Sequence, residues 1–145
     1  MTVEANIQLL RRAWAAYDKG DEEGFASCLT DDWREYNSAG EEGTSLADER
    51  RAMQAHRFAF PDKHTEIHRI VADEETVACH CTVKAHHTGK YFDAEPTGKE
   101  VILHEMMFNR VRGGRLCETW GMVDGPGFYE QITGKRPPEN LDNIG

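Results

Sequence analysis

The sequence predicts an α+β domain in which helices come first and an antiparallel sheet follows. Apolar side chains recur every three or four residues in the first part of the chain, the spacing that indicates amphipathic helices. From Thr65 onward the apolar period changes to two, which is typical of strands. The glycine pair Gly113-Gly114 then separates two strand-like segments, as in a hairpin. Helices followed by strands indicate a helical layer packed on one face of a sheet.

The first helix is predicted from Thr2 to Gly20. Its apolar stripe has steps of three, four and three and consists of Ile7, Leu10, Trp14 and Tyr17. The Thr2 hydroxyl can cap the first turn, and Gly20 can end the helix in a left-handed conformation. A second, shorter helix is predicted to follow, with Asp21 as its cap and with Phe25 and Leu29 among its apolar residues.

A third helix is predicted to begin after Thr44 or Ser45. It should end before Pro61, because the residue that precedes a proline is pushed out of the helical conformation. Its apolar stripe consists of Leu46, Met53, His56 and Phe60. Residues 38–43, which contain two glycines and two glutamates, are predicted to form the loop before it.

Four strands are predicted after the third helix, over residues 65–72, 76–85, 101–111 and 115–124. Asp124-Gly-Pro-Gly127 then opens a short last helix that reaches Ile132. Residues 1–133 are predicted to form one domain, since a chain of 145 residues suits one core and is too short for two. Residues 134–145 hold two prolines and few apolar side chains, and they are predicted to be a C-terminal extension.

The composition argues against several classes of function. The formal net charge is −9, and no cluster of lysines and arginines could neutralise a run of phosphates, which argues against nucleic-acid binding. No apolar run approaches the roughly 20 residues that a membrane span needs. The N-terminus lacks the basic and apolar regions of a signal peptide, so we expect a cytoplasmic protein. The four cysteines lie on apolar-patterned segments, and we expect reduced, buried thiols.

The hairpin at the glycine pair predicts which side chains share a face. A three-residue loop, Arg112-Gly113-Gly114, would pair Val111 with Arg115. One face then carries Leu103, Glu105, Met107, Asn109, Cys117, Thr119, Gly121 and Val123, and the other carries His104, Met106, Phe108, Leu116, Glu118, Trp120, Met122 and Asp124. Neither face is purely polar, so we expect the helices to cover one face and another surface to cover the second.

Short motifs occur in order along the chain: Ala59-Phe-Pro-Asp62, His87-Thr-Gly89, Pro96-Thr-Gly98, Arg110-Val111 with Gly114 and Leu116, and Trp120 with Asp124. With this order and spacing, the chain from Asn6 to about Gln131 resembles the SnoaL-like polyketide cyclase and ester cyclase family of the NTF2-like superfamily. The resemblance implies a conical barrel, in which a strongly curved antiparallel sheet wraps around three N-terminal helices and encloses a pocket. It also implies a homodimer or homotetramer, here through the sheet.

In the polyketide cyclases that the chain resembles, an aspartate on the last long strand is the general acid/base of an aldol ring closure. A histidine on the preceding strand assists it. Alignment at Arg110-Val111 and the turn glycine places the aspartate at Gly121 and the histidine at Met107. The aromatic position of the first helix falls on Tyr17. The resemblance therefore implies the family's pocket without its acid/base pair.

Glu105 is the leading candidate for a catalytic base, because it lies two residues from Met107 on the face predicted to line the pocket. Desolvation there would raise its pKa towards neutrality; the alternative is a structural, hydrogen-bonded glutamate. His87 ends its strand, where it could polarise a substrate oxygen or bond the backbone of the following loop. Asp124 could face the pocket mouth or cap the last helix.

The remaining candidates are substrate-binding residues: Tyr17, Glu35, Phe60, Met107, Thr119, Trp120 and Gly121. No metal site is expected among the cysteines and histidines between Cys79 and His87, because neighbours on a strand point to opposite faces. No cofactor is expected either, and no Gly-rich phosphate loop opens a helix.

Three hypotheses for function follow. In the first, the chain is a cofactor-free enzyme that isomerises, hydrates or cyclises a carbonyl-bearing compound by proton transfer. In the second, it is a ligand-binding or carrier protein with the same pocket; in the third, it is a dimerisation module. The expected ligand is small and hydrophobic or carbonyl-bearing. A deep pocket with Glu105 inside would favour the enzyme or the carrier over the module.

Overall fold

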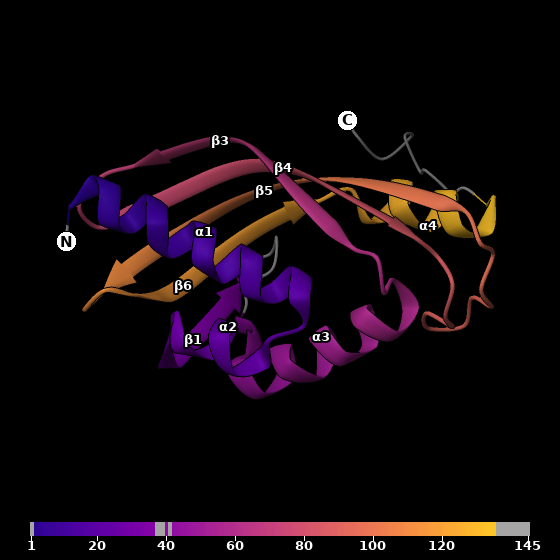
Figure 1. The fold of residues 1–145 in the computed structure, drawn as a ribbon, viewed down its shortest axis with the longest axis horizontal. Helices are drawn as coiled ribbons and strands as arrows, with labels where there is room; N and C mark the ends of the chain where they lie inside the picture. Colours follow the sequence, from indigo (N-terminus) through magenta and orange to yellow (C-terminus); the bar gives the residue numbers. More distant parts are fainter. Residues whose placement is uncertain (1, 37–39, 41, 136–145) are drawn as a thin grey trace.

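The computed structural model describes residues 2–36, 40 and 42–135 and confirms the α+β class (Figure 1). In chain order its elements are α1 (Val3–Lys19), α2 (Glu22–Ser27), β1 (Leu29–Tyr36), β2 (Glu42–Ser45), α3 (Leu46–Ala59), β3 (His64–Ala72), β4 (Thr76–His86), β5 (Glu100–Arg112), β6 (Arg115–Val123) and α4 (Gly125–Thr133). The predicted C-terminal extension lies outside the described residues except for Gly134 and Lys135.

The helix ends agree with the predicted caps. Thr2 caps α1, and Gly20 ends it in the left-handed conformation, with φ 67°. Asp21 caps α2. Ser45, one of two predicted caps, forms a reciprocal capping box with Asp48 at the start of α3. These signals are reliable because a cap depends only on residues within the same turn.

The strands form one six-stranded sheet in the order β2-β1-β6-β5-β4-β3. The neighbouring pairs are antiparallel except for β1 and β6, which are parallel. The sequence predicted neither β2 nor the parallel pair, since the period of a strand does not identify a distant partner. Glu42 and Gly43, which fall in the predicted loop 38–43, belong to β2; residues 38, 39 and 41 lie outside the described residues.

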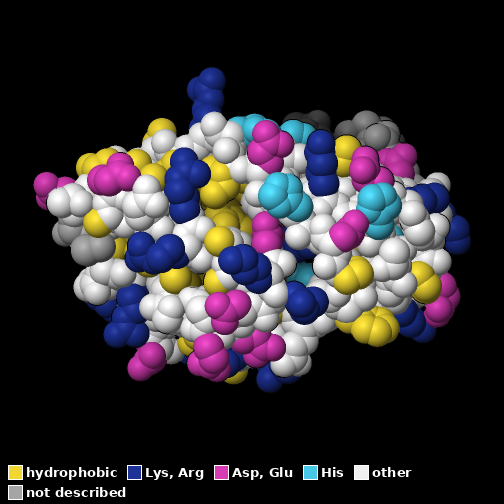
Figure 2. Space-filling model, viewed as in Figure 1, with side chains coloured by type: hydrophobic (Ala, Val, Ile, Leu, Met, Phe, Trp, Pro, Cys, Tyr) yellow, Lys and Arg dark blue, Asp and Glu magenta, His cyan; other side chains and the backbone are white. Residues whose placement is uncertain are grey.

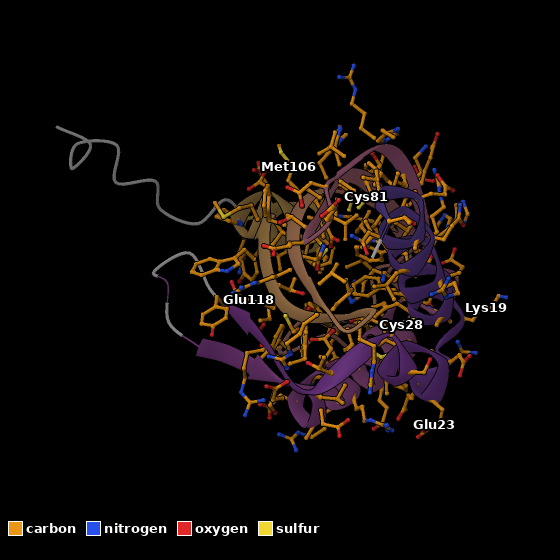
Figure 3. All side chains as sticks on the ribbon, turned by 90° about the vertical axis from the view of Figure 1, so that its left-hand side faces the viewer. Lys19, Glu23, Cys28, Cys81, Met106 and Glu118 are labelled. Atoms are coloured by element: carbon orange, nitrogen blue, oxygen red, sulfur yellow. The ribbon has the colours of Figure 1, made fainter. Side chains whose placement is uncertain are left out.

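The sheet curves strongly around the helices (Figures 1 and 3). α1 packs against β3 and β4, α3 against β1 and β2, and α4 against β5. The core between α1 and the sheet includes Leu9, Trp33 and Val77. Cys28 and Cys81 lie in the same core, and all four thiols are free (Figure 3). No helix among the described residues has the length and apolar character needed to span a membrane.

The β5–β6 hairpin differs from the prediction in its turn. Arg112 pairs with Arg115, so the loop contains only Gly113 and Gly114. Both glycines have positive φ, 58° and 77°. A two-residue turn with two left-handed residues matches the twist of the strands, and glycine adopts it without strain. The predicted three-residue loop is therefore wrong.

A β-bulge at Cys117 compensates for the shorter turn. It lies between the pairs Val111–Leu116 and Arg110–Glu118, and Cys117 has no partner of its own in the ladder. Because of the bulge, Glu118 and the later residues of β6 keep the predicted faces. The prediction for Leu116 is wrong: this residue was placed on the outer face, but it is 3% exposed and lies in the core.

The outer face of β5 and β6 is exposed and largely apolar. Met106, Phe108, Trp120 and Met122 are between 41% and 63% exposed. Met106 marks this outer surface in Figure 3. On the face shown in Figure 2, by contrast, acidic and basic side chains are interspersed with apolar ones. A contiguous exposed apolar patch is typical of an interaction surface.

We expect this outer face to join two copies of the chain. Sedimentation velocity at micromolar concentration should detect a dimer or a larger assembly. The double variant Phe108→Glu/Met122→Glu should sediment as a monomer, because burying unpaired carboxylates costs several kcal/mol. Phe58→Glu is the matched control, since Phe58 is 68% exposed on α3, and it should leave the assembly intact. A monomeric unmodified chain would contradict the prediction.

Candidate active site

The concave side of the sheet and the helices enclose a cavity of about 700 Å³. Aromatic side chains form much of its wall, among them Trp14, Tyr17, Phe25, Trp33, Phe60 and Phe128. Pockets of about 300–1,000 Å³ with mostly apolar walls are typical of small-molecule sites. The cavity therefore has the size and the lining expected for an apolar ligand.

Three glutamates from three different elements face this cavity: Glu35 from β1, Glu49 from α3 and Glu105 from β5. Burial raises the pKa of all three carboxyl groups. In the described part of the chain no side chain donates a hydrogen bond to Glu35 or Glu105, which leaves both available to a ligand. Among the same residues, no three His, Cys, Asp or Glu side chains are placed to hold a metal ion.

Glu35 lies against a glycine on the neighbouring strand. Its backbone pairs with Thr119 of β6, and a Cβ atom at Gly121 would be 3.3 Å from the Glu35 Oε1 atom. Burial, helped by the charges of Glu49 and Glu105, raises the pKa of Glu35 to about 7. Gly121 therefore leaves space for a carboxyl group that is protonated in about half of the molecules at neutral pH.

Glu105 differs from Glu35 because a cation lies near it. Burial raises the pKa of Glu105, and the Lys63 ammonium group opposes that shift. The Lys63 Nζ atom is 3.6 Å from Asp18 Oδ1 and 3.9 Å from the centre of the Tyr17 ring. Opposite charge favours the ionised form of a carboxyl group, so Lys63 helps to keep Glu105 in the form that can accept a proton.

His56 connects two tyrosines at the cavity wall. Its Nδ1 atom is 3.0 Å from the Tyr17 hydroxyl, and its Nε2 atom is 3.1 Å from the Tyr91 hydroxyl. Burial, helped by the charge of Lys63, lowers the pKa of His56 to about 4, so the ring is neutral near pH 7. Burial, helped by the charge of Glu49, raises the pKa of Tyr17. Tyr17 is therefore a neutral hydrogen-bond donor in the wall.

A buried chain of hydrogen bonds fixes the strands beneath the cavity. Trp33 Nε1 donates to Thr119 Oγ1 at 2.9 Å, and the Thr119 hydroxyl donates to Asn109 Oδ1 at 2.8 Å. Asn109 Nδ2 then donates to the Val77 carbonyl at 3.2 Å. The chain links β1, β6, β5 and β4, and a buried network with every member bonded holds its strands in one arrangement.

The family profile of the SnoaL-like polyketide cyclases matches residues 7–132. The chain belongs to this family. The matched range includes all six strands of the sheet and the three glutamates of the cavity.

Solved structures share the fold of this SnoaL-like chain. AclR of Streptomyces galilaeus, described as a candidate hydroxylase, is 26% identical with a TM-score of 0.85, over 97% of this chain and 88% of AclR. TsrD of Streptomyces laurentii is 19% identical with a TM-score of 0.81, over 93% of this chain and 99% of TsrD. A candidate SnoaL-like polyketide cyclase from Jannaschia sp. CCS1 is 12% identical with a TM-score of 0.81, over 94% and 95% of the two chains. These likenesses confirm the predicted NTF2-like fold. No curated protein matches the chain.

Seven of the predicted site residues lie in the cavity wall: Tyr17, Glu35, Phe60, Glu105, Met107, Thr119 and Gly121. Met107 and Gly121, where the SnoaL-like cyclases are expected to carry their histidine and aspartate, pair directly across β5 and β6. The Glu35 carboxyl group from β1 lies beside that position. This member of the family therefore has a carboxyl group near the position where the family is expected to carry its aspartate, supplied by a different strand.

His87 does not line the cavity, which contradicts a contact with the substrate and confirms the alternative, a hydrogen bond to the backbone of the following loop. It is fully buried just beyond β4. Its Nδ1 atom accepts a hydrogen bond from the Thr97 backbone N–H at 3.3 Å and lies 3.0 Å from the Thr97 hydroxyl. The chain turns at His87, whose backbone bonds that of Gly98 and Lys99, so the ring points to the following loop.

Asp124 and Trp120 also lie outside the cavity wall; for Asp124 this confirms the predicted helix cap over the pocket-mouth role, and for Trp120 it contradicts the predicted substrate contact. Asp124 is exposed and caps α4 by accepting a hydrogen bond from the Gly127 backbone N–H at 2.9 Å. Trp120 lies on the outer face, where its ring stacks on Tyr36 with centroids 4.8 Å apart. The reason is strand alternation: Trp120 directly precedes the inward-facing Gly121, and successive side chains point to opposite faces.

Four polar residues of the site were not predicted: Glu49, His56, Lys63 and Tyr91. Glu49 and His56 lie seven residues apart on the inward stripe of α3. Glu49 lies three residues after Leu46 and four before Met53, so it shares the apolar face of the helix. A charged residue at such a position was the signal that could have identified it. Lys63 and Tyr91 lie in connecting segments, where no periodicity predicts which way a side chain points.

Proposed function

We propose that the protein is an acid/base enzyme that moves a proton next to the carbonyl group of an apolar small molecule, using its own side chains. The observation that carries the proposal is the pair Glu35 and Glu105. Both face one apolar cavity, and their surroundings shift their pKa values to different extents. Carboxyl groups that titrate apart can serve as acid and base in the same reaction. Isomerisation, hydration and ring closure all use such a pair.

In this proposal Glu105 is the base, because Lys63 favours its ionised form and the apolar wall limits its solvation. Glu105 takes a proton from the carbon beside the carbonyl group. The electrons of that C–H bond form a C=C bond, and the carbonyl π electrons move to the oxygen. Protonated Glu35 or the Tyr17 hydroxyl donates a hydrogen bond to this oxygen.

The second half of the reaction decides the product class. Return of the proton from Glu105 to a different carbon isomerises the compound. Attack of the enol carbon on a second carbonyl group closes a ring instead. The family profile is that of polyketide cyclases, and AclR is described as a candidate hydroxylase, so relatives with this fold are linked to more than one reaction.

A second candidate function is a ligand carrier with the same cavity. Gly121 and Met107 favour it, because neither can act as an acid or a base where the family is expected to have such groups. The carrier and the enzyme differ in one respect that can be measured. The carrier does not need an ionised, poorly solvated carboxylate, whereas the enzyme does.

The test uses 5-nitrobenzisoxazole, an apolar probe whose C–H bond is broken by a base as its N–O bond opens to a coloured phenolate. We expect the protein to accelerate this elimination, and Glu105→Gln to lose about 10²-fold in kcat/KM, the usual contribution of a general base. Glu66→Gln is the matched control, since Glu66 is exposed on β3, and it should keep full activity. Equal rates for the unmodified protein and Glu105→Gln would contradict the enzyme and favour the carrier.

A further inference from the structure

We propose that Lys63 captures an apolar aldehyde or ketone in the cavity as a covalent imine. The inference deepens the proposed function and rests on it, because the carbonyl-bearing ligand is taken from there. Three observations support it: the amine nitrogen lies at the cavity wall, no described residue holds it by a short hydrogen bond, and carboxyl groups that can move protons lie around it.

The side chain of Lys63 is part of the cavity wall. Lys63 lies in the turn between α3 and β3, and its side chain is 15% exposed. Its Nζ atom is 3.9 Å from the centre of the Tyr17 ring, which belongs to the same wall. The charge on this nitrogen also acts on the wall carboxyl groups of Glu49 and Glu105. The nitrogen therefore lies where a ligand in the cavity can meet it.

Hydrogen bonds of the neighbouring residues fix the backbone at Lys63. On one side, Asp62 accepts a hydrogen bond from the His86 backbone N–H at 2.8 Å. On the other side, Thr65 donates from its backbone N–H and its hydroxyl to the two carboxylate oxygens of Asp18, at 2.7 Å each. The Lys63 side chain therefore extends from a fixed point, and a reactive group held in this way reacts with less loss of freedom.

The amine of Lys63 is not held in a tight ion pair, as a lysine with a purely structural role would be. Its Nζ atom is 3.6 Å from Asp18 Oδ1, which is longer than an N–H···O hydrogen bond. The Asp18 oxygens already accept the two hydrogen bonds from Thr65. In the described part of the chain, therefore, no partner has to be given up before the nitrogen can bond to a ligand.

Burial also favours the reactive form of this amine. It lowers the pKa of Lys63, and the charges of Asp18 and Glu105 oppose that shift. Only a neutral amine has the lone pair that attacks a carbonyl carbon, and desolvation in an apolar pocket activates a lysine in this way. The titratable groups that face Lys63 are Tyr17, Asp18, Glu49, His56, Cys81 and Glu105.

The capture step exchanges the carbonyl oxygen for the lysine nitrogen. A wall carboxylate takes a proton from the ammonium group. The nitrogen lone pair then bonds to the carbonyl carbon, the π electrons move to the oxygen, and one N–H proton transfers to that oxygen. The carboxyl group returns its proton to the new hydroxyl group, which leaves as water while the nitrogen lone pair forms the C=N bond. Ammonium ion and carbonyl compound have become iminium ion and water.

The iminium ion keeps the positive charge of Lys63 beside Glu105. The ion therefore still favours the ionised form of Glu105. For a ligand with a C–H bond next to the C=N bond, Glu105 takes the proton, the C–H electrons form a C=C bond, and the C=N π electrons move to the nitrogen. The imine thus gives the same base a second kind of electron acceptor.

The test uses 2-naphthaldehyde with sodium cyanoborohydride, which reduces the C=N bond to a stable secondary amine. This aldehyde has no hydrogen on the carbon next to its carbonyl group, so proton removal by Glu105 cannot contribute. Mass spectrometry of the full chain should show an adduct heavier by the mass of the aldehyde less one oxygen atom, and peptide mapping should place it on Lys63. At pH 7 Lys63 should react at least about tenfold faster than any other lysine, because each pH unit by which the pKa is lowered raises the neutral fraction about tenfold.

The chain provides its own controls. Its five other lysines are all exposed: Lys19, Lys84, Lys90, Lys99 and Lys135. Lys63→Arg keeps the charge, removes the nucleophile and should lose the fast adduct, whereas the matched variant Lys84→Arg should keep it. An excess of 2-methoxynaphthalene, which has the same rings and no carbonyl group, should suppress the adduct at Lys63 and leave those at exposed lysines unchanged.

Equal rates at Lys63 and at the exposed lysines would overturn the inference, and so would an adduct at Lys63 that 2-methoxynaphthalene does not suppress. The unmodified protein provides both of these tests, so the result does not depend on the folding of any variant. Failure of the two proposals can be told apart. A fast adduct at Lys63 without base-catalysed elimination contradicts only the proposed enzyme, and elimination without the adduct contradicts only the imine.

Discussion

Replacing Glu35 with glutamine should stabilise the protein above pH 7 and leave its stability unchanged below about pH 4.5. The carboxyl group of Glu35 has a pKa of about 7 in the folded protein, against about 4.5 in an unfolded chain. Below both pKa values the carboxyl group is protonated in the folded and in the unfolded protein, so it does not change the free energy of unfolding. As pH rises from about 4.5 to about 7, the unfolded state ionises first, so the free energy of unfolding falls.

At pH 8 the free energy of unfolding of Glu35→Gln should exceed that of the unmodified protein by about 2 kcal/mol. The full shift corresponds to about 3 kcal/mol at about 1.4 kcal/mol per pH unit, and the opening of the cavity to solvent reduces it. Urea unfolding at pH 4.5 and pH 8 measures the difference between variant and unmodified protein. This difference is needed because His56, whose pKa is lowered to about 4, adds stability as pH rises towards 6.5 and masks the effect.

Glu66→Gln provides the control for charge alone. Glu66 is exposed on β3, so its replacement should change the free energy of unfolding by less than about 0.5 kcal/mol at either pH. An equal gain for both variants would show that net charge, and not burial of Glu35, is responsible. Destabilisation by Glu35→Gln at pH 8 would show that the carboxylate has a stabilising partner.

Replacing Gly121 with aspartate should destabilise the protein by about 3 kcal/mol above pH 7. The variant returns the carboxyl group to the strand where the family is expected to have it, but Glu35 already occupies the adjacent space. Two carboxylates about 4 Å apart repel each other by about 4 kcal/mol at an intermediate dielectric constant. Protonation of one of them offsets part of this cost.

A double-mutant cycle isolates the repulsion. Gly121→Asp in the Glu35→Gln background should cost at least about 2 kcal/mol less than in the unmodified protein, by urea unfolding at pH 8. Gly121→Ala is the steric control. Its Cβ atom would meet only the flexible ends of Glu35 and Met107, at 3.3 Å and 3.5 Å, so we expect a cost below about 1 kcal/mol. Equal costs of Gly121→Asp in both backgrounds would mean that the two carboxyl groups do not share one space.

The elements of the fold were predictable where the controlling signal is local. Thr2, Asp21 and Ser45 cap their helices through contacts within one turn, and these predictions are confirmed. The inward side of β5 was predictable because the side-chain period of a strand is two. The length of the hairpin turn was not predictable. Two adjacent glycines fit a two-residue turn and a three-residue turn equally well, and only the strand pairing, Arg112 with Arg115, distinguishes them.

The site was predictable only in part, for a related reason. Glu105 and Gly121 lie on long strands whose faces follow from alternation, so their place in the wall could be inferred. Lys63 and Tyr91 face the cavity because distant segments meet there, and no local pattern contains that information. For His87 the sequence left two roles open, and only the structure decides between them, because the bend of the chain directs its ring to Thr97 and away from the cavity.

The parallel pairing of β1 with β6 has a consequence for how the protein is made. Trp33 and Thr119, which bond across this pair, are 86 residues apart in the sequence. During synthesis β1 must therefore wait for its partner until β6, which ends at Val123, has left the ribosome. Until then the edges of β1 and β5 lack their central neighbour, and unpaired strand edges attract other chains. Contacts of such long range also slow folding. The wall that carries Glu35 and Gly121 thus forms only after β6 has been made, and until then the unpaired strand edges favour aggregation.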